Sequence, residues 1–369
     1  MSGGAGADGV RHLYVHLPFC AHRCGYCDFV TLVGRGGEHR AYVDALLAEL
    51  RLERGVLSPR VETVFLGGGT PTFTEPDALE RLLAALPDAD EVTVEANPET
   101  VTQPLARLLS RNRVNRVSLG AQTFQTSLLD VLERRAGPDD VRRAVHTLRD
   151  AGFDNISLDL LYGIPGQTSA DLEADIEEAL ALAPEHVSYY ELEAKPGTRF
   201  THAHGEELAR QAEAMEGYFE CVVEGLVRAE YRWYETANFS RPGREARHNL
   251  GYWLGWDYLG LGIGAVSTLG LERRRNAPKL RGYAEALARG EAPPRELETL
   301  DEDTKRRERL MLGLRLDRPL PLGSVRGAVE PAALARAERL GLAERREDGL
   351  VLSDRGRFLG DAVTAELMA

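Results

Sequence analysis

The stretch Cys20-Ala-His-Arg-Cys24-Gly-Tyr-Cys27 holds three of the four cysteines of this 369-residue chain, and the fourth, Cys221, lies far away in the sequence. Four cysteines in a chain of this length do not form a disulfide scaffold, which indicates a reducing compartment. Cubane iron–sulfur clusters have four irons and usually take four cysteine thiolates. Three clustered thiols would therefore leave one iron open. The motif predicts a reactive centre rather than a cross-link.

Zinc is the main alternative ligand for these thiols. Structural zinc usually takes four closed protein ligands, and no fourth Cys or His with finger-like spacing is present. His16 and His22 lie too close to the motif to form a familiar zinc module. A redox Cys-x2-Cys pair would leave the third cysteine unexplained. The spacing therefore favours a cluster over zinc or a disulfide-exchange site.

Outward from the cysteines, short apolar or alternating runs recur, each followed by a segment of helical periodicity. Such βα units in succession indicate a parallel sheet with helices outside it. The predicted strands are His12–Phe19, Val61–Leu66, Glu91–Ala96, Arg116–Gly120, Asn155–Leu161 and His186–Leu192, and the predicted helices are Ala41–Arg54, Asp77–Leu86, Leu105–Arg111, Asp139–Ala151 and Ala170–Leu182.

Chemically distinctive residues follow the ends of these strands. The cysteines follow the first strand, Gly67–Thr70 follow the second, and Glu95 ends the third. In βα barrels the functional site lies at the carboxyl ends of the strands. We therefore predict an α/β fold of the partial (β/α)6, TIM-like barrel type, with its site at this end.

The second half of the chain has a different character. Glu206–Arg228 is predicted to be one amphipathic helix and Tyr231–Phe239 a seventh strand. From about Leu300 the chain becomes charged and helical, and an apolar run at Leu350–Leu352 precedes a helix through Leu367. We predict three regions, with the barrel at 10–240, a connecting segment at 241–298, and a small helical or winged-helix-like domain at 299–369.

Composition excludes some classes of protein. The formal charge of −13 argues against a general nucleic-acid binder, which usually has a basic face. No apolar stretch approaches the roughly 20 residues of a membrane helix. Residues 1–9 lack the apolar core of a signal peptide. The expected location is therefore the cytoplasm, and peripheral membrane contact stays open.

The Cys-x3-Cys-x2-Cys spacing resembles that of the radical S-adenosylmethionine superfamily. The resemblance implies a [4Fe-4S] cluster on Cys20, Cys24 and Cys27, with its open iron chelated by the amino and carboxylate groups of S-adenosylmethionine. Phe65–Thr72 resembles the superfamily's glycine-rich strand exit. Val94–Pro98 places a carboxylate where the superfamily binds the ribose hydroxyls of the cofactor.

Three further stretches narrow the resemblance to the oxygen-independent coproporphyrinogen III oxidases and their relatives. They are Tyr14–Cys20, Arg116–Phe124 and Asp159–Thr168. Gly260–Ser267 resembles the family's glycine-rich closing segment, which implies backbone contact with the cofactor's adenine. The contacts with S-adenosylmethionine that the resemblance implies are Tyr14, Tyr26, Gly68, Gly69, Thr70, Glu95, Gln122, Arg134 and Asp159.

Two observations indicate a branch of this family. The decarboxylating oxidases carry a further cysteine two residues after the third, where this chain has Phe29. The stretch Arg247–Trp253 matches the His-Asn-x-x-Tyr-Trp motif of the family's heme chaperone branch. Neutral imidazole is a common axial ligand of heme iron. The implied heme-binding residues are His248, as axial ligand, with Asn249, Tyr252 and Trp253, and His202 and His204 are alternative ligands.

The sequence therefore predicts a heme chaperone that binds heme and transfers it to an acceptor protein. It would carry a [4Fe-4S] cluster with S-adenosylmethionine at the open iron, and nucleic acid is not expected as a partner. The alternative is an oxygen-independent coproporphyrinogen III dehydrogenase, which decarboxylates two propionate chains to give protoporphyrinogen IX. Phe29 and the motif around His248 favour the chaperone.

Overall fold

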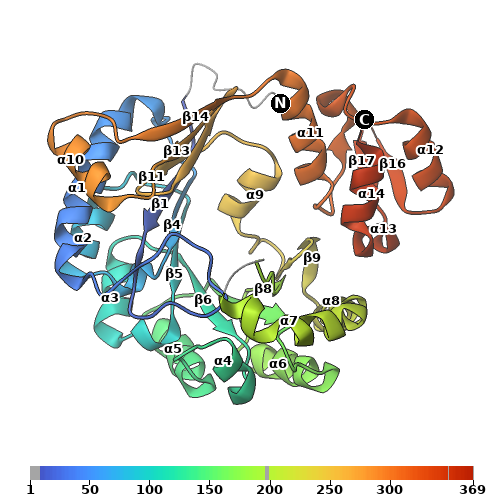
Figure 1. The fold of residues 1–369 in the computed structure, drawn as a ribbon, viewed down its shortest axis with the longest axis horizontal. Helices are drawn as coiled ribbons and strands as arrows, with labels where there is room; N and C mark the ends of the chain where they lie inside the picture. Colours follow the sequence, from blue (N-terminus) through green and yellow to red (C-terminus); the bar gives the residue numbers. More distant parts are fainter. Residues whose placement is uncertain (1–8, 196–198, 348, 369) are drawn as a thin grey trace.

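The computed structural model describes residues 9–195, 199–347 and 349–368. Its centre is a run of parallel strands in the order β1-β4-β5-β6-β7-β8. Helices lie outside the strands (Figure 1). This arrangement confirms the predicted α/β barrel type. The strands are β1 His12–Leu17, β4 Thr63–Gly68, β5 Glu91–Ala96, β6 Arg116–Gln122, β7 Ile156–Tyr162 and β8 His186–Glu191, and the helices are α1 His39–Glu53, α2 Pro76–Ala85, α3 Gln103–Arg111, α4 Thr126–Val131, α5 Pro138–Asp150 and α6 Ser169–Ala181.

The two faces of the strands differ in polarity. Val92, Val94 and their neighbours on one face are buried in the main apolar core. The alternating residues on the other face are polar, among them Glu95, Ser118 and Asp159. Because successive side chains of a strand point to opposite faces, the polar set shares the inner face of the barrel. The fold thus gathers ionisable groups in its interior.

The predicted seventh strand is wrong. Tyr231–Phe239 forms a hairpin of β9 Arg232–Glu235 and β10 Asn238–Ser240, and β10 pairs antiparallel with β8. Trp233 Nε1 donates to the Thr236 carbonyl at 3.0 Å, and the Ala237 amide donates to Glu235 Oε2 at 3.0 Å. These two bonds close the turn. The sheet is extended on its other side by β11 Leu259–Leu261, which runs parallel to β1.

The prediction of one helix over Glu206–Arg228 is also wrong. The chain forms α7 Arg199–Gln211, a 3-10 turn at Ala212–Ala214, and α8 Met215–Arg228. Gln211 ends α7 with its side chain turned inward. Its Nε2 donates to the carbonyls of Ile164 at 3.0 Å and Gln167 at 3.2 Å. This anchorage to the loop before α6 interrupts the helix.

Two further units follow the barrel strands. The connecting segment forms α9 Arg247–Trp253, helix α10 Leu280–Ala288, and an antiparallel sheet of β12 Val266–Leu269, β13 Glu272–Asn276 and β14 Arg295–Thr299. The C-terminal unit has its own apolar core and a three-stranded antiparallel sheet, which fits the predicted small winged-helix-like domain. Its elements are α11 Glu302–Gly313, β15 Leu320–Pro321, α12 Pro331–Arg339, β16 Ala343–Arg346, β17 Gly349–Leu352, α13 Asp354–Phe358 and α14 Gly360–Leu367. The boundaries at 240 and 298 stay predictions.

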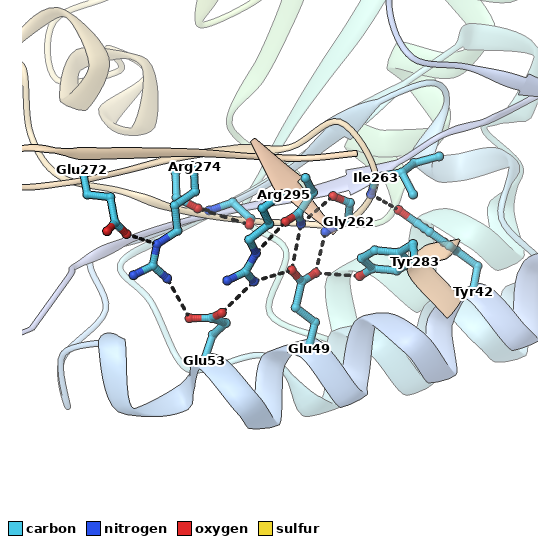
Figure 2. Close-up of polar contacts among 12 residues, drawn as sticks. Tyr42, Glu49, Glu53, Gly262, Ile263, Glu272, Arg274, Tyr283 and Arg295 are labelled. Carbon is cyan, nitrogen blue, oxygen red and sulfur yellow. Dashed lines mark hydrogen bonds and ion pairs between the residues drawn. The ribbon is translucent and has the colours of Figure 1, made fainter. Parts of the chain in front are cut away.

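A buried carboxylate fastens the connecting segment to the barrel (Figure 2). Glu49 on α1 is fully buried. Its Oε2 accepts from the Gly262 amide at 2.8 Å and the Tyr283 hydroxyl at 2.6 Å. Its Oε1 accepts from Asn276 Nδ2 at 2.7 Å and lies 3.1 Å from Arg295 Nη2. One side chain therefore joins α1 to α10, to β13, to β14 and to the turn after β11.

Within the described residues, no helix is long and apolar enough to cross a membrane.

Candidate functional site

The cysteine loop leaves and returns at the carboxyl end of β1. Strand β2 Phe19–Cys20 follows β1 and pairs in parallel with β3 Leu32–Val33, which closes the loop. Cys20 is buried, whereas Cys24 and Cys27 are partly exposed. The Cys27 amide donates to the Cys24 carbonyl at 3.2 Å. The loop thus presents three free thiols beside the barrel mouth, as the sequence predicted.

Hydrogen-bond donors surround these sulfurs. Thr70 Oγ1 lies 3.5 Å from Cys20 Sγ. Arg134 Nη1 lies 3.6 Å from Cys24 Sγ and 3.1 Å from Asn97 Oδ1, and its Nη2 donates to the Gly120 carbonyl at 2.6 Å. Burial raises the pKa of the Cys20 and Cys27 thiols, so these two sulfurs would have to lose a tightly held proton to bind metal. Thr70 and Arg134 provide donors that could hydrogen-bond to sulfurs of a bound cluster.

The backbone of Gly69 packs closely against the first cysteine. A Cβ at this position would lie 3.0 Å from Cys20 Sγ and 2.6 Å from the Pro18 backbone. Among the described residues, no three Cys, His, Asp or Glu side chains are gathered tightly enough to hold a single metal ion. Soft thiolate donors select iron–sulfur clusters or zinc. The three thiol donors fit the predicted cluster, whose ligands stay a prediction.

Two carboxylates lie behind the loop on the inner face of the barrel. Glu95 Oε2 accepts from the Gly68 amide at 3.0 Å. Asp159 accepts from the Ser118 hydroxyl at 2.9 Å and from the Ser157 hydroxyl at 3.3 Å. Burial, with the charge of Asp159 adding to it, raises the pKa of Glu95 to about 7. Burial also raises the pKa of Asp159. Both groups can accept hydrogen bonds from hydroxyl groups of a ligand.

Tyr14 and Gln122 belong to the same end of the barrel. The Tyr14 hydroxyl lies 3.0 Å from His16 Nδ1, and His16 Nε2 lies 2.8 Å from the Val30 carbonyl, so this strand is tied to the cysteine loop. The pairing of β6 with β7 shifts register between Gly120 and Gln122, where Gln122 has a φ of 68°. A bulge of this kind re-aims a side chain at the rim of a barrel.

Tyr26 packs its ring in a satellite apolar cluster, and its hydroxyl lies close enough to Arg134 and Asp159 to interact with their charges. It packs against a group of buried side chains from the loops and helices around α4 and α7, among them Leu132 and Phe200. The structure therefore brings most of the predicted cofactor contacts together around the cysteine loop. Their contact with S-adenosylmethionine stays a prediction.

The raised pKa of Glu95 predicts a pH-dependent stability. Because the folded carboxyl binds its proton more tightly than the unfolded one, the stabilisation is full below about pH 4.5 and is lost as pH rises towards 7. From pH 5 to pH 8, the free energy of unfolding of wild type should fall because Glu95 releases its proton. In Glu95→Gln this fall should be smaller by up to about 3 kcal/mol. Urea unfolding at both pH values measures this. Equal losses in the two proteins would contradict the raised pKa.

His248 lies inside the fold. It is 2 % exposed and stacks on Phe65 with 5.2 Å between ring centroids. Its Nδ1 lies 2.8 Å from Thr63 Oγ1, and its Nε2 lies 2.9 Å from the Tyr252 hydroxyl. Burial lowers its pKa to about 3. Glu91 accepts from the His248 amide at 3.0 Å and so caps the start of α9. Both ring nitrogens thus have protein partners.

The other residues of the motif point in different directions. Tyr252 packs edge-on against Tyr258 at 4.7 Å between centroids. Trp253 faces the C-terminal domain, where the Arg315 guanidinium lies 4.7 Å from its ring centroid. Asn249 is partly exposed. The motif therefore does not present one shared open face, and its role in binding heme stays a prediction.

The alternative ligands His202 and His204 lie on α7. They line an open cavity of about 730 Å³ together with Arg210, Glu206 and Glu207. Neither imidazole is buried. These histidines, unlike His248, are accessible to a ligand from solvent.

Sequence reasoning missed several partners in the barrel. Ser118 and Ser157 hold Asp159, and Thr63 lies within 2.8 Å of Nδ1 of both His12 and His248. The available signal was position along the strand, because these residues share the inward face with the predicted site residues. Serine and threonine are common in strands, so the alternation of inward and outward side chains alone did not mark these residues as partners of the site.

Comparison with known proteins identifies the family of the chain. The model of the Radical SAM superfamily matches residues 14–179, and that of the HemN C-terminal domain matches residues 300–359. The heme chaperone HemW of Mycobacterium tuberculosis is 37 % identical and the alignment covers 96 % of this chain and 94 % of the relative. HemW of Bacillus subtilis is 32 % identical, with 96 % and 98 % covered.

A solved structure supports the fold. Coproporphyrinogen III oxidase (HemN) from Escherichia coli superposes with a TM-score of 0.79 at 22 % identity, covering 98 % of this chain and 91 % of that chain. At this identity the likeness concerns the fold alone. The end-to-end similarity to the curated relatives is closer, and it assigns the branch. The chain therefore belongs to the HemW branch of the HemN-like radical S-adenosylmethionine proteins.

Proposed function

We propose that this protein is a heme chaperone, which binds heme and passes it to an acceptor protein. The observation that carries the proposal is 37 % identity to a curated heme chaperone along 96 % of the chain. Phe29, exposed at 64 %, adds support, because it stands where the decarboxylating oxidases are expected to carry a cysteine. The expected location is the cytoplasm.

In this proposal Cys20, Cys24 and Cys27 hold a [4Fe-4S] cluster whose open iron takes S-adenosylmethionine. The bound cluster and cofactor would supply one-electron chemistry, and the protein supplies ligation and orientation. Bonds to Asn97 and Gly120 hold Arg134, whose guanidinium contacts Cys24 of the loop. Glu95, held by the Gly68 amide, would accept hydrogen bonds from the ribose hydroxyls of the cofactor.

His248 does not fit an axial heme ligand in this conformation. A heme iron would have to displace Thr63 from Nδ1 or Tyr252 from Nε2, and the ring is 2 % exposed. Ligation by His248 would thus require α9 to leave the barrel. The imidazoles of His202, which is exposed, and His204, which is partly exposed, need no such change.

A hemin titration of the anaerobically reconstituted protein tests the function. We expect a saturable Soret shift in wild type, because a heme carrier must bind heme. His248→Ala identifies the ligand, and His146→Ala, which removes an exposed imidazole of α5, is the matched control. An unchanged Soret band in His248→Ala would exclude His248 as the ligand, and no Soret shift in wild type would contradict the proposal.

The dehydrogenase alternative is tested in parallel. The same protein is incubated anaerobically with coproporphyrinogen III and S-adenosylmethionine. A chaperone should form no protoporphyrinogen IX. Catalytic formation of this product would overturn the proposal.

A further inference from the structure

A groove lies between α1 and α10, which are side by side in the fold (Figure 1). It encloses about 530 Å³, and its floor includes Leu32, Leu280 and Ala284. Small-molecule sites are typically apolar concavities of roughly 300–1,000 Å³ with a few polar groups. The groove has the size and the apolar floor of such a site.

The rim of the groove is basic. Arg35, Lys279 and Arg281 line it, together with Glu38. Arg35 pairs with Glu38 at 2.7 Å, and Arg281 pairs with Glu285 at 2.7 Å. Among the residues that the structure describes, Lys279 forms no ion pair. The lining thus carries a net positive charge on a chain whose formal charge is −13, so the groove favours a ligand that is apolar and anionic at once.

We propose that this groove docks a porphyrin that carries two ionised propionates, with the flat ring on the apolar floor and the propionates at Lys279 and Arg281. The assignment rests on the proposed heme-carrying function. Charge complementarity selects this occupant, because heme combines large apolar faces with two carboxylates on one edge. Propionates at the open rim would keep their contact with water while pairing with the cations.

Docking in this groove does not depend on iron. The lining contains no His, Cys or Met. Its one phenol, Tyr42, donates to the His16 carbonyl at 2.9 Å and accepts from the Ile263 amide at 3.1 Å, so it is held within the protein. Metal-free protoporphyrin IX should therefore bind as well as hemin, which separates this site from any that ligates iron.

The groove adjoins the cysteine loop. Leu32 in its floor belongs to β3, which pairs with β2 so that Leu32 is opposite Phe19 and Val33 is opposite Cys20. A porphyrin in the groove would thus lie behind the strand pair that carries the first cysteine. The occupied groove would stiffen the base of the loop that presents the thiols.

The larger cavity on α7 suits a porphyrin less well. Glu206 and Glu207 line it against a single arginine, Arg210, which is paired with Glu207 at 2.6 Å, so this lining lacks the net positive charge of the groove. Its two histidines suit iron, which makes it an alternative only for hemin.

The test measures binding of protoporphyrin IX by fluorescence, next to hemin by absorbance. Lys279→Glu/Arg281→Glu reverses two exposed charges of the rim. Arg228→Glu/Arg307→Glu, on α8 and α11, is the matched control with the same change in net charge. We expect the rim variant to bind both porphyrins about tenfold or more weakly and the control to bind as wild type does. Protoporphyrin IX dimethyl ester, whose carboxylates are masked, should bind wild type as weakly as the rim variant binds the free acid.

Each other outcome has a distinct meaning. Wild type that binds neither porphyrin contradicts the proposed function. Wild type that binds both, with a rim variant that binds equally well, overturns the groove and leaves the function standing. Loss of hemin binding in His202→Ala/His204→Ala, with protoporphyrin IX never bound, assigns the site to α7 instead. Loss of binding to phosphatidylglycerol vesicles by the rim variant, with porphyrin binding intact, assigns the groove to lipid. Thermal melts confirm that the variants fold.

Discussion

Replacing Cys24 with serine is expected to abolish the cluster in the reconstituted protein. A cubane cluster brings about four irons per chain, and each thiolate is one of only three protein ligands available in the loop. The Arg134 guanidinium lies 3.6 Å from Cys24 Sγ, so the variant also loses this contact. We expect iron content and visible absorbance to fall to near background.

The matched control is Cys221→Ser. Cys221 lies on α8, packed against the main apolar core and remote from the loop. The control should keep about four irons per chain. Zinc in the purified wild type, with no visible absorbance after reconstitution, would refute the cluster. Full iron in the Cys24 variant would refute its ligand assignment.

Glu49→Ala is expected to lower the free energy of unfolding by about 3–5 kcal/mol. The change leaves Arg295 buried beside only one carboxylate, Glu53 at 2.6 Å. It also removes the acceptor of the Gly262 amide and of the Tyr283 hydroxyl. Breaking a buried pair costs far more than breaking a surface pair, because the remaining groups cannot be solvated. Urea denaturation measures the difference.

Glu285→Ala is the control for this prediction. It removes one member of an exposed i,i+4 ion pair on α10, the helix that also carries Tyr283. Exposed pairs contribute little to stability. We expect an unfolding midpoint close to that of wild type. A Glu49 variant that unfolds at the same urea concentration as this control would show that the network does not fasten the connecting segment.

The barrel was predictable because its signal is local and repeated. Apolar runs alternate with helical periodicity, and each unit repeats the pattern, so β4 and β5 were found close to their bounds. The hairpin at Tyr231–Phe239 was not predicted. Its turn depends on hydrogen bonds of the Trp233 and Glu235 side chains, which composition does not reveal. The end of α7 depends on contacts of Gln211 with a loop more than forty residues away.

The site was predictable where motifs are dense. The three cysteines and Glu95 stand in short, distinctive stretches, and the structure places them at one end of the barrel. Arg134 and Arg135 could not be separated by sequence. The structure distinguishes them, because Arg134 reaches the Cys24 sulfur whereas Arg135 is exposed. The burial of His248 was unpredictable, because it results from pairing with Thr63, 185 residues away.

The helix α9 limits how the chain can be divided. One end of it is bonded inside the barrel through His248, and the other carries Trp253 and Leu250, which pack with Leu316 and Tyr234. Arg309 Nη1 donates to the Trp253 carbonyl at 3.2 Å. A fragment ending before residue 300 would leave the apolar side of α9 uncovered and would tend to aggregate. The C-terminal domain therefore covers an apolar surface that the barrel unit would otherwise expose to water.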